Sequence, residues 1–496
     1  MKEFDLKTLL KKCKLKKEVK HNNNFLVKGI SLHSKDIKNN FIFAAIKGKL
    51  FNGEIFVNEF SKLRNIAVII SSKSNLNFDS PEFKRITFIK TDDVRILISE
   101  IASIVFPNEI KNKFAITGTN GKTSVASYVK QIWGKKNINS ASVGTLGIKS
   151  DKHNSGKIKL TTPDVISNHQ VLNKLWKKGC NNIIFEASSI GLEQKRLYPL
   201  KFDVVAFTNL SIDHMDYHIN IHNYKNSKSI LFSSHIKKSS IAVINSDSKH
   251  ADYFFNICKK NNVKVLDYGK KANFLKILKT ERVNDFFVIT LLLNQKEITI
   301  KIQCFCEFEI QNKLCALIMV FNKRLRQEHL VYLKELKNPE GRLEKIFDKR
   351  NIRVYIDYAH TPDALSKVLY SLRKITLGKL YIVFGCGGDR DKTKRPEMTN
   401  KALEHSDKVF ITNDNPRFED PKEIIDDMLR GLDKKKLNKI VLIGDRSKAI
   451  ESAIKKLETD DLLLIAGKGH ENYQLIRNRK YSFSDKKIAK NILRKI

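Results

Sequence analysis

Residues 114–124 combine glycine, lysine and hydroxyl side chains in an order that suits phosphate binding. An apolar run at 114–116 predicts a strand, and Gly-Thr-Asn-Gly-Lys-Thr-Ser follows at 118–124. Glycine lets backbone N–H groups approach phosphate oxygens closely, and the start of a helix adds the positive end of its dipole. Lys122 can then reach the outer phosphates, and the Thr123 hydroxyl can bind Mg²⁺. The pattern predicts a nucleotide phosphate site.

This loop is shorter than the common phosphate-binding loop. The common spacing would place a glycine at position 116, where this chain has Ile116, so only Gly118 and Gly121 are available. An ordinary glycine-rich turn between a strand and a helix is the alternative reading. The residues expected to bind nucleotide phosphates are Gly118, Thr119, Asn120, Gly121, Lys122, Thr123 and Ser124.

A second group of polar residues follows two further apolar runs. Glu186 comes directly after the run 183–185, and the segment 209–218 contains two Asp and two His. Glu186 offers carboxylate oxygen and His214 offers imidazole nitrogen, which together with Thr123 suit Mg²⁺ beside bound phosphates. A solvated polar loop after a strand is the alternative.

The last third of the chain carries charged residues on several predicted turns. Asp357 follows an apolar run, where its carboxylate could hold a ribose hydroxyl or a cation. Arg390 lies in a glycine-rich turn, Asn415 and Arg417 flank a proline, and Glu471 ends the run Gly-Lys-Gly-His-Glu. Guanidinium groups bind carboxylates through two hydrogen bonds, and a glutamate can take an ammonium group. Together these residues suit a zwitterionic amino acid, although each turn alone would suit a charged surface.

Short apolar runs between polar turns are expected to form the strands that position these loops. The expected strands lie at 41–46, 66–70, 86–89, 114–116, 183–185, 204–207, 241–244, 354–356, 380–384, 408–411, 440–443 and 462–465. Helices are expected near 6–15, 94–106 and 314–321, and additional antiparallel strands within 274–310.

The order of these elements predicts an α/β fold with three domains. A small N-terminal α/β domain at 1–110 precedes a central mononucleotide-binding sheet domain at 111–338. Pro339 to Gly341 is expected to be a hinge, and a second doubly wound, Rossmann-like domain follows at 339–496.

Composition limits the classes of partner. At 496 residues the chain is too long for a single core, and 41% hydrophobic with 29% charged residues indicate a globular protein. The net charge of +39 could indicate a nucleic-acid partner, but the lysines are scattered along the whole chain without a basic tail. A general bias towards lysine explains the charge, so no nucleic-acid partner is expected. A basic protein that hydrolyses ATP on nucleic acid is the alternative from a different class.

The cysteines and apolar runs predict a reducing, aqueous location. The seven cysteines form no pair of CxxC motifs, and Cys304 and Cys306 lie on a strand-like run, so neither zinc nor disulfides are expected. The longest apolar runs, such as 286–293, are too short to span a bilayer, and no apolar segment follows the lysine-rich N-terminus. A cytoplasmic protein without a membrane span is expected.

Taken together, these motifs resemble the Mur ligases, ATP-dependent enzymes that build the peptide stem of peptidoglycan. The short phosphate loop matches the loop of that family, which explains the missing upstream glycine. The resemblance covers nearly the whole chain, including Ser34, 161–163, 186–196, 209–218, 341–344, 357–362 and the C-terminal loops. The turn 414–417 is similar to the signature of the family member that adds meso-2,6-diaminopimelate.

The resemblance implies a reaction and its participants. ATP and Mg²⁺ would drive amide formation between meso-diaminopimelate and the D-glutamate γ-carboxylate of UDP-MurNAc-L-Ala-D-Glu, through an acyl phosphate. The product is a peptidoglycan precursor, which links the enzyme to cell-wall synthesis, cell shape and division. A monomer is expected.

The resemblance also assigns residues to roles. Catalytic roles fall to Lys122, Glu186, His214 and Lys228. Mg²⁺ is expected on Thr123, Glu186, His214 and Lys228, the last as a carbamate. Beyond the phosphate loop, ATP is expected to contact Asn245, Arg342 and Asp357. The UDP-muramoyl dipeptide is expected to contact Leu32, Ser34, Thr161, Thr162, Ser188, Gln194 and Arg196. Diaminopimelate is expected to contact Arg390, Asp414, Asn415, Pro416, Arg417, Gly467 and Glu471.

Several positions depart from the family pattern, and related enzymes remain alternatives. The departures are His33, Lys35, Ile190, Cys306 and Glu309, which concern the uridine and muramoyl contacts and the last helix of the middle domain. The lysine-adding family member and a folylpolyglutamate-type synthetase are the nearest enzyme alternatives. Asn415, Arg417 and the N-terminal domain argue against both. The intact Lys122, Glu186, His214 and Lys228 argue against an inactive homologue.

Overall fold

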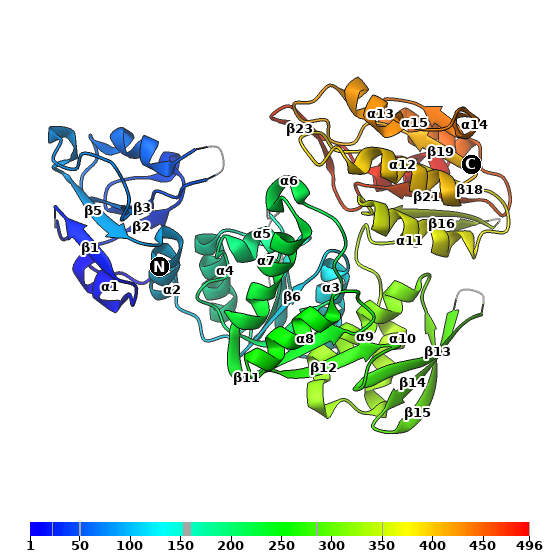
Figure 1. Ribbon diagram of the computed structural model, residues 1–496, viewed down its shortest axis with the longest axis horizontal. Coiled ribbons are helices and arrows are strands. Elements are labelled where there is room, and N and C mark those ends of the chain that lie inside the picture. The colour runs from blue at the N-terminus through cyan, green and yellow to red at the C-terminus, as the bar shows by residue number, and fades with distance from the viewer. Residues whose placement is uncertain (22, 49–50, 152–159, 284–285, 350, 496) are drawn as a thin grey trace.

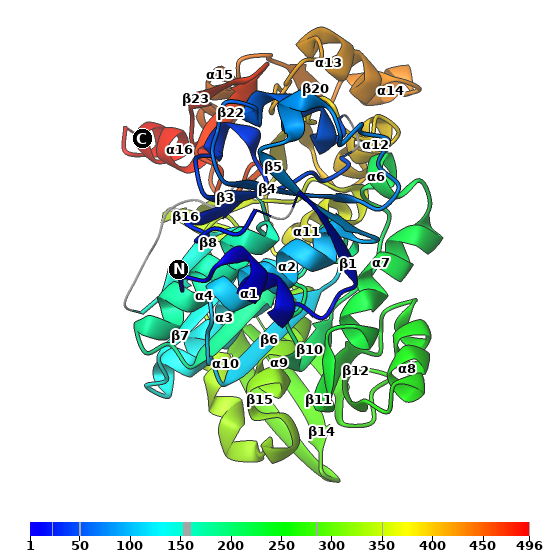
Figure 2. The same cartoon turned by 90° about the vertical axis from the view of Figure 1, so that its left-hand side faces the viewer.

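The computed structural model describes residues 1–21, 23–48, 51–151, 160–283, 286–349 and 351–495. Figure 1 shows three α/β parts in chain order: an N-terminal part in blue, a middle part in cyan to green, and a last part in yellow to red. In Figure 2 the N-terminal part faces the viewer and lies in front of the other two. Among the described residues, no helix has both the length and the apolar character needed to cross a membrane.

The N-terminal part is built on a five-stranded sheet. In spatial order its strands are β1 (Lys17–Lys20), β5 (Ile86–Thr91), β4 (Ile66–Ser71), β3 (Phe41–Ala44) and β2 (Gly29–Ser31). β2 to β5 pair in parallel, and β1 pairs antiparallel with β5. Helices α1 (Leu6–Lys12) and α2 (Val94–Val105) complete this part. Leu97 and Ile98 of α2 share a hydrophobic core with Val165 and Ile166, so α2 joins this part to the middle part.

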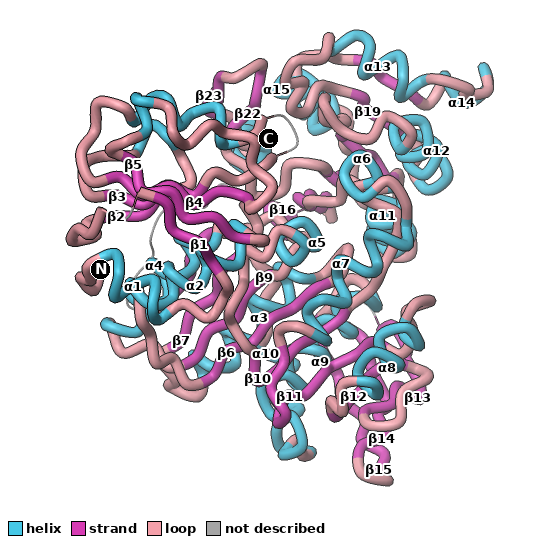
Figure 3. Tube along the Cα trace, turned by 60° about the vertical axis from the view of Figure 1, so that its left-hand side comes forward, coloured by secondary structure: helices cyan, strands magenta, loops and turns pink. Residues whose placement is uncertain are grey.

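A ten-stranded sheet forms the middle part. In spatial order its strands are β15 (Lys296–Gln303), β14 (Phe286–Leu293), β13 (Leu275–Val283), β12 (Lys264–Gly269), β11 (Ile236–Asn245), β10 (Phe202–Phe207), β6 (Asn112–Thr117), β9 (Asn182–Glu186), β7 (Ser140–Gly144) and β8 (Gly147–Ser150). β6 lies at the centre and pairs in parallel with β10 and β9. Figure 3 shows five neighbouring strands of this sheet running side by side, in the spatial order β7, β9, β6, β10 and β11.

Helices cover both faces of the middle sheet. α3 (Lys122–Lys135) and α9 (Glu307–Phe321) pack on one face, and α4 (Val165–Lys177), α7 (Ile221–Ser233) and α8 (Ala251–Lys260) pack on the other. Three short helices, α5 (Ser189–Glu193), α6 (Met215–His218) and α10 (Tyr332–Glu335), lie in the connections. Because both faces are buried, the loops at the carboxyl ends of the parallel strands are the accessible places for ligands.

The region 274–310 differs in part from the prediction. β13 to β15 form the expected antiparallel pairs, but α9 already begins at Glu307. The Glu309 carboxylate accepts hydrogen bonds from the backbone N–H groups of residues 305 and 306, both at 3.1 Å, which stabilises this early helix start. The prediction of a strand at Cys304 and Cys306 is therefore wrong, because both lie in the loop before α9.

A six-stranded sheet forms the last part. In spatial order its strands are β16 (Glu344–Lys349), β17 (Ile352–Asp357), β21 (Leu462–Ala466), β18 (Leu380–Phe384), β19 (Lys408–Ile411) and β20 (Ile440–Leu442). All pair in parallel except β16, which forms an antiparallel edge. α11 (Pro362–Arg373), α12 (Lys394–His405) and α13 (Pro421–Leu429) cover one face, and α15 (Arg446–Lys455) and α16 (Asp485–Leu493) cover the other.

A two-stranded hairpin and one short helix complete the last part. The hairpin consists of β22 (Tyr473–Ile476) and β23 (Arg479–Ser482), and the helix is α14 (Lys434–Leu437). The α/β fold class predicted from the sequence is confirmed. Several predicted site residues follow the carboxyl ends of parallel strands: the phosphate loop follows β6, Ser188 follows β9, and the turn 414–417 follows β19.

Candidate active site

The predicted phosphate loop lies between β6 and α3, at the carboxyl end of the central strand. Gly118 and Gly121 have φ angles of 150° and 89°, where other residues are strained. A Cβ atom would lie 1.9 Å from Thr208 Oγ1 at Gly118 and 2.5 Å from Asn312 Oδ1 at Gly121. The backbone path therefore requires both glycines, and it leads directly into a helix N-terminus of the kind that binds anions.

Two lysines converge on this loop. Lys122 Nζ donates hydrogen bonds to the carbonyl oxygens of Gly118 at 2.7 Å and Thr119 at 2.8 Å. Lys228 Nζ donates to the same Gly118 carbonyl at 2.9 Å. Burial lowers the pKa of Lys122 to about 8 and holds the pKa of Lys228 well below its ordinary range. Bound phosphates would favour the charged form of Lys122.

The Thr123 hydroxyl connects the middle and last parts. It donates to Glu186 Oε2 at 2.8 Å, and Arg342 Nη2 donates to Thr123 Oγ1 at 3.1 Å. Thr145 donates to both Glu186 oxygens, through its N–H at 2.9 Å and its hydroxyl at 3.0 Å. Hydroxyl and carboxylate oxygens are ligands that Mg²⁺ prefers, so Thr123 and Glu186 fit the predicted cation.

His214, the third predicted metal ligand, pairs with a buried aspartate. Its Nε2 lies 3.4 Å from Asp213 Oδ2, and His360 and Lys394 of the last part each lie 4.0 Å from the Asp213 carboxylate. Within the described part of the chain, no group of three or more His, Cys, Asp or Glu side chains is placed to hold a metal ion. The complete Mg²⁺ ligand set therefore stays a prediction.

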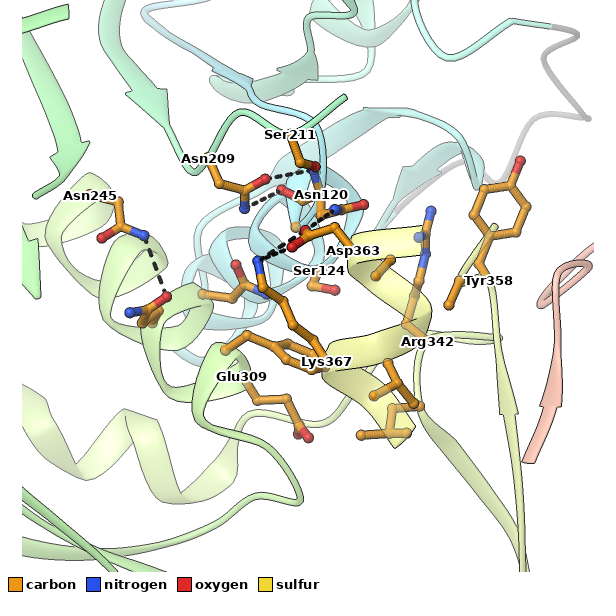
Figure 4. A pocket seen from close by; sticks show the side chains of 18 of the residues that line it. Asn120, Ser124, Asn209, Ser211, Asn245, Glu309, Arg342, Tyr358, Asp363 and Lys367 are labelled. Carbon is orange, nitrogen blue, oxygen red and sulfur yellow. Dashed lines mark hydrogen bonds and ion pairs between the residues drawn. The ribbon is translucent and has the colours of Figure 1, made fainter. Parts of the chain in front are cut away.

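A cavity of about 460 Å³ lies between the middle and last parts (Figure 4). Six of the predicted ATP residues line it, namely Asn120, Gly121, Ser124, Asn245, Arg342 and Asp357. The other four belong to the same phosphate loop. Asn120 Nδ2 donates to Asp363 Oδ2 at 3.4 Å, and Lys367 Nζ donates to the same oxygen at 2.9 Å. The cavity thus unites the phosphate loop with α11 of the last part.

The cavity wall from the last part is built around Arg342 and Asp357. The Arg342 guanidinium lies 4.4 Å from the centre of the Tyr358 ring, a cation–π contact that orients it towards Thr123. Asp357 accepts backbone N–H groups from Leu343 at 2.6 Å and Ala359 at 2.7 Å. Burial raises the pKa of Asp357, while Arg342 and these hydrogen bonds act in the opposite direction.

Four predicted dipeptide-binding residues form one hydrogen-bonded network beside Glu186. Thr162 Oγ1 lies 3.0 Å from Ser188 Oγ, and Arg196 Nη1 donates to the Thr162 carbonyl at 2.9 Å. Arg196 Nη2 also donates to Gln194 Oε1 at 2.7 Å. A fifth predicted residue, Thr161, joins through Thr145, since their hydroxyl oxygens are 3.2 Å apart.

The two remaining dipeptide-binding residues lie in the N-terminal part. Leu32 follows β2, and Ser34 begins a short 3₁₀ turn. No hydrogen bond between these two residues and the network around Arg196 is recorded among the described residues. An ion pair between Lys195 and Asp93, at the start of α2, nevertheless ties the N-terminal part to the loop that carries this network.

The predicted diaminopimelate residues gather around a lysine that the sequence analysis did not single out. Lys468 Nζ donates to Asn415 Oδ1 at 3.0 Å and Glu471 Oε2 at 3.2 Å, and lies 3.7 Å from Asp414 Oδ1. Asn415 Nδ2 donates to Glu471 Oε2 at 2.9 Å. We call these four residues, Asp414, Asn415, Lys468 and Glu471, the amino-acid clamp. Gly467 borders the clamp, because a Cβ there would lie 2.9 Å from Asp414 Oδ2.

The arginines predicted for this site differ in their surroundings. Arg417, which follows Pro416, donates from Nη1 to the Gly388 carbonyl at 2.6 Å. Its backbone N–H donates to the Leu475 carbonyl at 3.0 Å, so β22 supports the turn. Arg390 is exposed, and no side-chain partner of it is recorded among the described residues.

Sequence reasoning missed several residues that the structure places in the site. Asp363 and Lys367 lie four positions apart on α11 after Pro362. This spacing places both side chains on one face of a helix, so the sequence could have indicated the pair. Tyr358 follows the predicted Asp357 directly. Lys468 gave no such signal, since a lysine between two glycines reads as an exposed turn.

The phosphate loop and the cavity between two sheets define a nucleotide-binding α/β enzyme, and the comparisons with known proteins give its family. The Mur ligase middle domain matches residues 116–320, and the Mur ligase, glutamate ligase domain matches residues 341–469. A UDP-N-acetylmuramoyl-L-alanyl-D-glutamate–2,6-diaminopimelate ligase from Rickettsia montanensis is 36% identical over 477 residues, covering 94% of this chain and 96% of the relative. The chain belongs to the Mur ligase family.

Solved structures agree with this family. A structure of a UDP-N-acetylmuramoyl-L-alanyl-D-glutamate–2,6-diaminopimelate ligase has a TM-score of 0.64 and 30% identity, and the match covers 95% of both chains. A MurF ligase from Thermotoga maritima in complex with ADP has a TM-score of 0.59 at 16% identity, covering 95% of this chain and 97% of that chain. The second likeness shows the shared fold.

Proposed function

We propose that the chain is an ATP- and Mg²⁺-dependent amide ligase of peptidoglycan precursor synthesis. It adds meso-2,6-diaminopimelate to the D-glutamate γ-carboxylate of UDP-MurNAc-L-Ala-D-Glu. The similarity to a ligase of that name over 94% of the chain supports the reaction. The observation that carries the choice of amino acid is the amino-acid clamp, because its buried donors and acceptors suit the zwitterionic end of diaminopimelate.

The first chemical step transfers a phosphoryl group. The D-glutamate γ-carboxylate attacks the γ-phosphorus of ATP, the bond to ADP breaks, and an acyl phosphate forms. Lys122 and the backbone of residues 118–121 hold the phosphates, and Arg342 reaches the same place from the last part. Mg²⁺, held by Thr123 and Glu186, would neutralise phosphate charge.

Lys228 is suited to carry the carbamate that the family resemblance implies. Lys228 is 1% exposed, and burial together with the nearby Lys122 lowers its pKa, which favours the neutral, nucleophilic form of the amine. A neutral amine can add to carbon dioxide. The resulting carbamate is anionic, and it would supply a charge that lysine itself cannot offer to a cation.

The second chemical step forms the amide. The amine of diaminopimelate attacks the acyl phosphate, and phosphate leaves. The amino-acid clamp and Arg417 hold the far end of the amino acid, which fixes the direction of attack. Catalysis of this step is mainly positioning.

Closure of the last part on the middle part assembles the site. Arg342 contacts Thr123, and Asp363 contacts Asn120, across the two parts. Gly341, in the predicted hinge, has a φ angle of 68°, and a Cβ there would lie 2.1 Å from the His470 backbone nitrogen. The hinge therefore packs against the loop that carries the clamp, which couples closure to amino-acid binding.

The organisation and location of the protein follow from the same proposal. We infer three domains with the predicted boundaries at 110 and 338, one for each large sheet. We also infer a monomer that acts in the cytoplasm, where ATP and the UDP-linked substrate are available. All seven cysteines are free and buried, which suits a reducing compartment. Sedimentation of the purified chain at several concentrations tests the monomer.

A phosphate-release assay tests the reaction. The purified chain is incubated with ATP, Mg²⁺ and UDP-MurNAc-L-Ala-D-Glu, and receives meso-diaminopimelate, L-lysine or no amino acid in parallel. We expect sustained release only with diaminopimelate. Release with lysine alone would contradict the amino-acid specificity, and release that depends on added nucleic acid would contradict the reaction.

A further inference from the structure

Lys468 is a buried cation at the centre of the amino-acid clamp. Its side chain is 0% exposed although it lies between two glycines in the loop after β21. Its Nζ donates hydrogen bonds to Asn415 Oδ1 at 3.0 Å and Glu471 Oε2 at 3.2 Å, and forms an ion pair with Asp414 Oδ1 at 3.7 Å. All three partners are residues predicted to bind diaminopimelate.

Lys468 fixes the direction in which the Asn415 amide faces. Asn415 Oδ1 accepts from Lys468 Nζ and from the Leu475 backbone N–H at 2.8 Å, so both of its lone pairs are used. Asn415 Nδ2 donates one hydrogen to Glu471 at 2.9 Å, which accounts for one of its two N–H groups. With Lys468 in place, Asn415 offers a ligand only a donor.

Glu471, in contrast to Asn415, offers a ligand an acceptor. Its Oε2 accepts from both Lys468 and Asn415, and no side-chain partner of its Oε1 is recorded among the described residues. The clamp therefore presents a donor on Asn415 next to an acceptor on Glu471. The carboxylate and ammonium of an amino-acid centre are the complementary pair.

We propose that Lys468 is a positioning residue that sets this donor–acceptor polarity, and with it the preference for an amino acid whose far end is zwitterionic. The inference rests on the proposed function and deepens it. An amino acid that ends in an ammonium group alone, such as L-lysine, leaves the Asn415 donor without an acceptor. Sites with a buried polar group left unpaired reject such analogues strongly.

Lys468→Met tests the role of the ammonium, because methionine keeps most of the side-chain length without the charge. Steady-state kinetics of the full chain give KM and kcat with diaminopimelate and with L-lysine. We expect the KM for diaminopimelate to rise about tenfold or more, and the preference over lysine to fall by a similar factor. The KM values for ATP and for the UDP-muramoyl dipeptide should not change. A general loss of structure would instead change these two KM values as well.

Lys480→Met is the matched control. Lys480 lies on β23 and its Nζ is 4.1 Å from the centre of the Tyr473 ring, which Lys468 Nζ also approaches at 5.8 Å. It makes no recorded contact with Asn415 or Glu471 among the described residues. Wild-type kinetics are expected for this variant.

Asn415→Asp tests the donor–acceptor polarity of the clamp if Lys468→Met does not fold. It keeps the oxygen that accepts from Lys468 and Leu475 and replaces only the donor. We expect a loss of diaminopimelate preference of about tenfold or more, because a carboxylate oxygen then faces Glu471 in place of the Asn415 donor. An unchanged preference, or an equal loss with both amino acids, would overturn the proposal. Failure of the wild-type chain to ligate diaminopimelate would instead overturn the proposed function.

Discussion

Asp485→Asn perturbs the ion pair that holds the end of β21 in place. Arg446 and Asp485 form two hydrogen bonds of 2.8 Å each, and both side chains are 0% exposed. Arg446 Nη2 also donates to the Ala466 carbonyl at 2.8 Å, directly before the loop of the amino-acid clamp. The substitution keeps the shape of the side chain and removes its charge.

The structure sets the expected size of the effect. Removing one partner of a buried ion pair leaves an uncompensated charge, which costs about 3–5 kcal/mol in the free energy of unfolding. For a domain of roughly 150 residues, each kcal/mol lowers the Tm by about 2–4 °C, so we expect a fall of about 6–20 °C. Asp485→Asn removes the charge that holds Arg446, which weakens the support of Arg446 for the Ala466 carbonyl. The KM for diaminopimelate should therefore also rise, while the KM for ATP should not change.

Differential scanning calorimetry of the full chain measures the Tm of the affected transition. Glu451→Gln is the control, since Glu451 lies on the same helix α15 and pairs with Lys455 at 2.7 Å, with side chains 46% and 66% exposed. Exposed pairs of this kind contribute little, so its Tm should match the wild-type chain. A Tm decrease with Asp485→Asn no larger than that with Glu451→Gln would show that the buried pair does not stabilise the last part.

Three further predictions follow from the middle part. Lys122→Ala should lower phosphate release by about a thousandfold or more with an unchanged Tm, and retained ligation would contradict its phosphate-binding role. Removing dissolved carbon dioxide should reduce activity until bicarbonate is restored, and mass spectrometry should find a carbamate on Lys228; activity indifferent to carbon dioxide would contradict it. Burial holds the pKa of His169 and His235 at about 4, below the ordinary 6.5, so the unfolded chain binds more protons between these values. The free energy of unfolding should therefore fall as the pH drops from 6.5 to 4, and His235→Gln should weaken this dependence in urea titrations; an unchanged dependence would contradict the burial argument.

The strands and the phosphate loop could be predicted because their signals are local. Buried apolar runs end at polar loops, and the spacing of Gly118, Gly121 and Lys122 encodes the loop by itself. The start of α9 could not be predicted in this way. It depends on the Glu309 side chain, which accepts two backbone N–H groups of the preceding turn.

When loops that are distant in sequence bury a charged residue, its burial cannot be predicted from the residues next to it in the chain. Lys468 is buried because Asp414 and Asn415, from the loop after β19, meet Glu471 from the loop after β21. Asp213 is likewise approached by His360 and Lys394 from the last part. Such contacts depend on how two separate segments pack, so sequence reasoning identified the segments but not the residues at their centre. The predicted roles of the site residues stay predictions until variants are measured.

Ligation through an acyl phosphate is tested by following one oxygen atom through the reaction. UDP-MurNAc-L-Ala-D-Glu with heavy oxygen in the D-glutamate γ-carboxylate is incubated with the purified chain, ATP, Mg²⁺ and meso-diaminopimelate. Mass spectrometry then reads both the peptide product and the released phosphate. Ligation through an acyl phosphate predicts the diaminopimelate amide, together with one heavy oxygen in each phosphate. Phosphate without the label, or ATP hydrolysis without the amide, would contradict it.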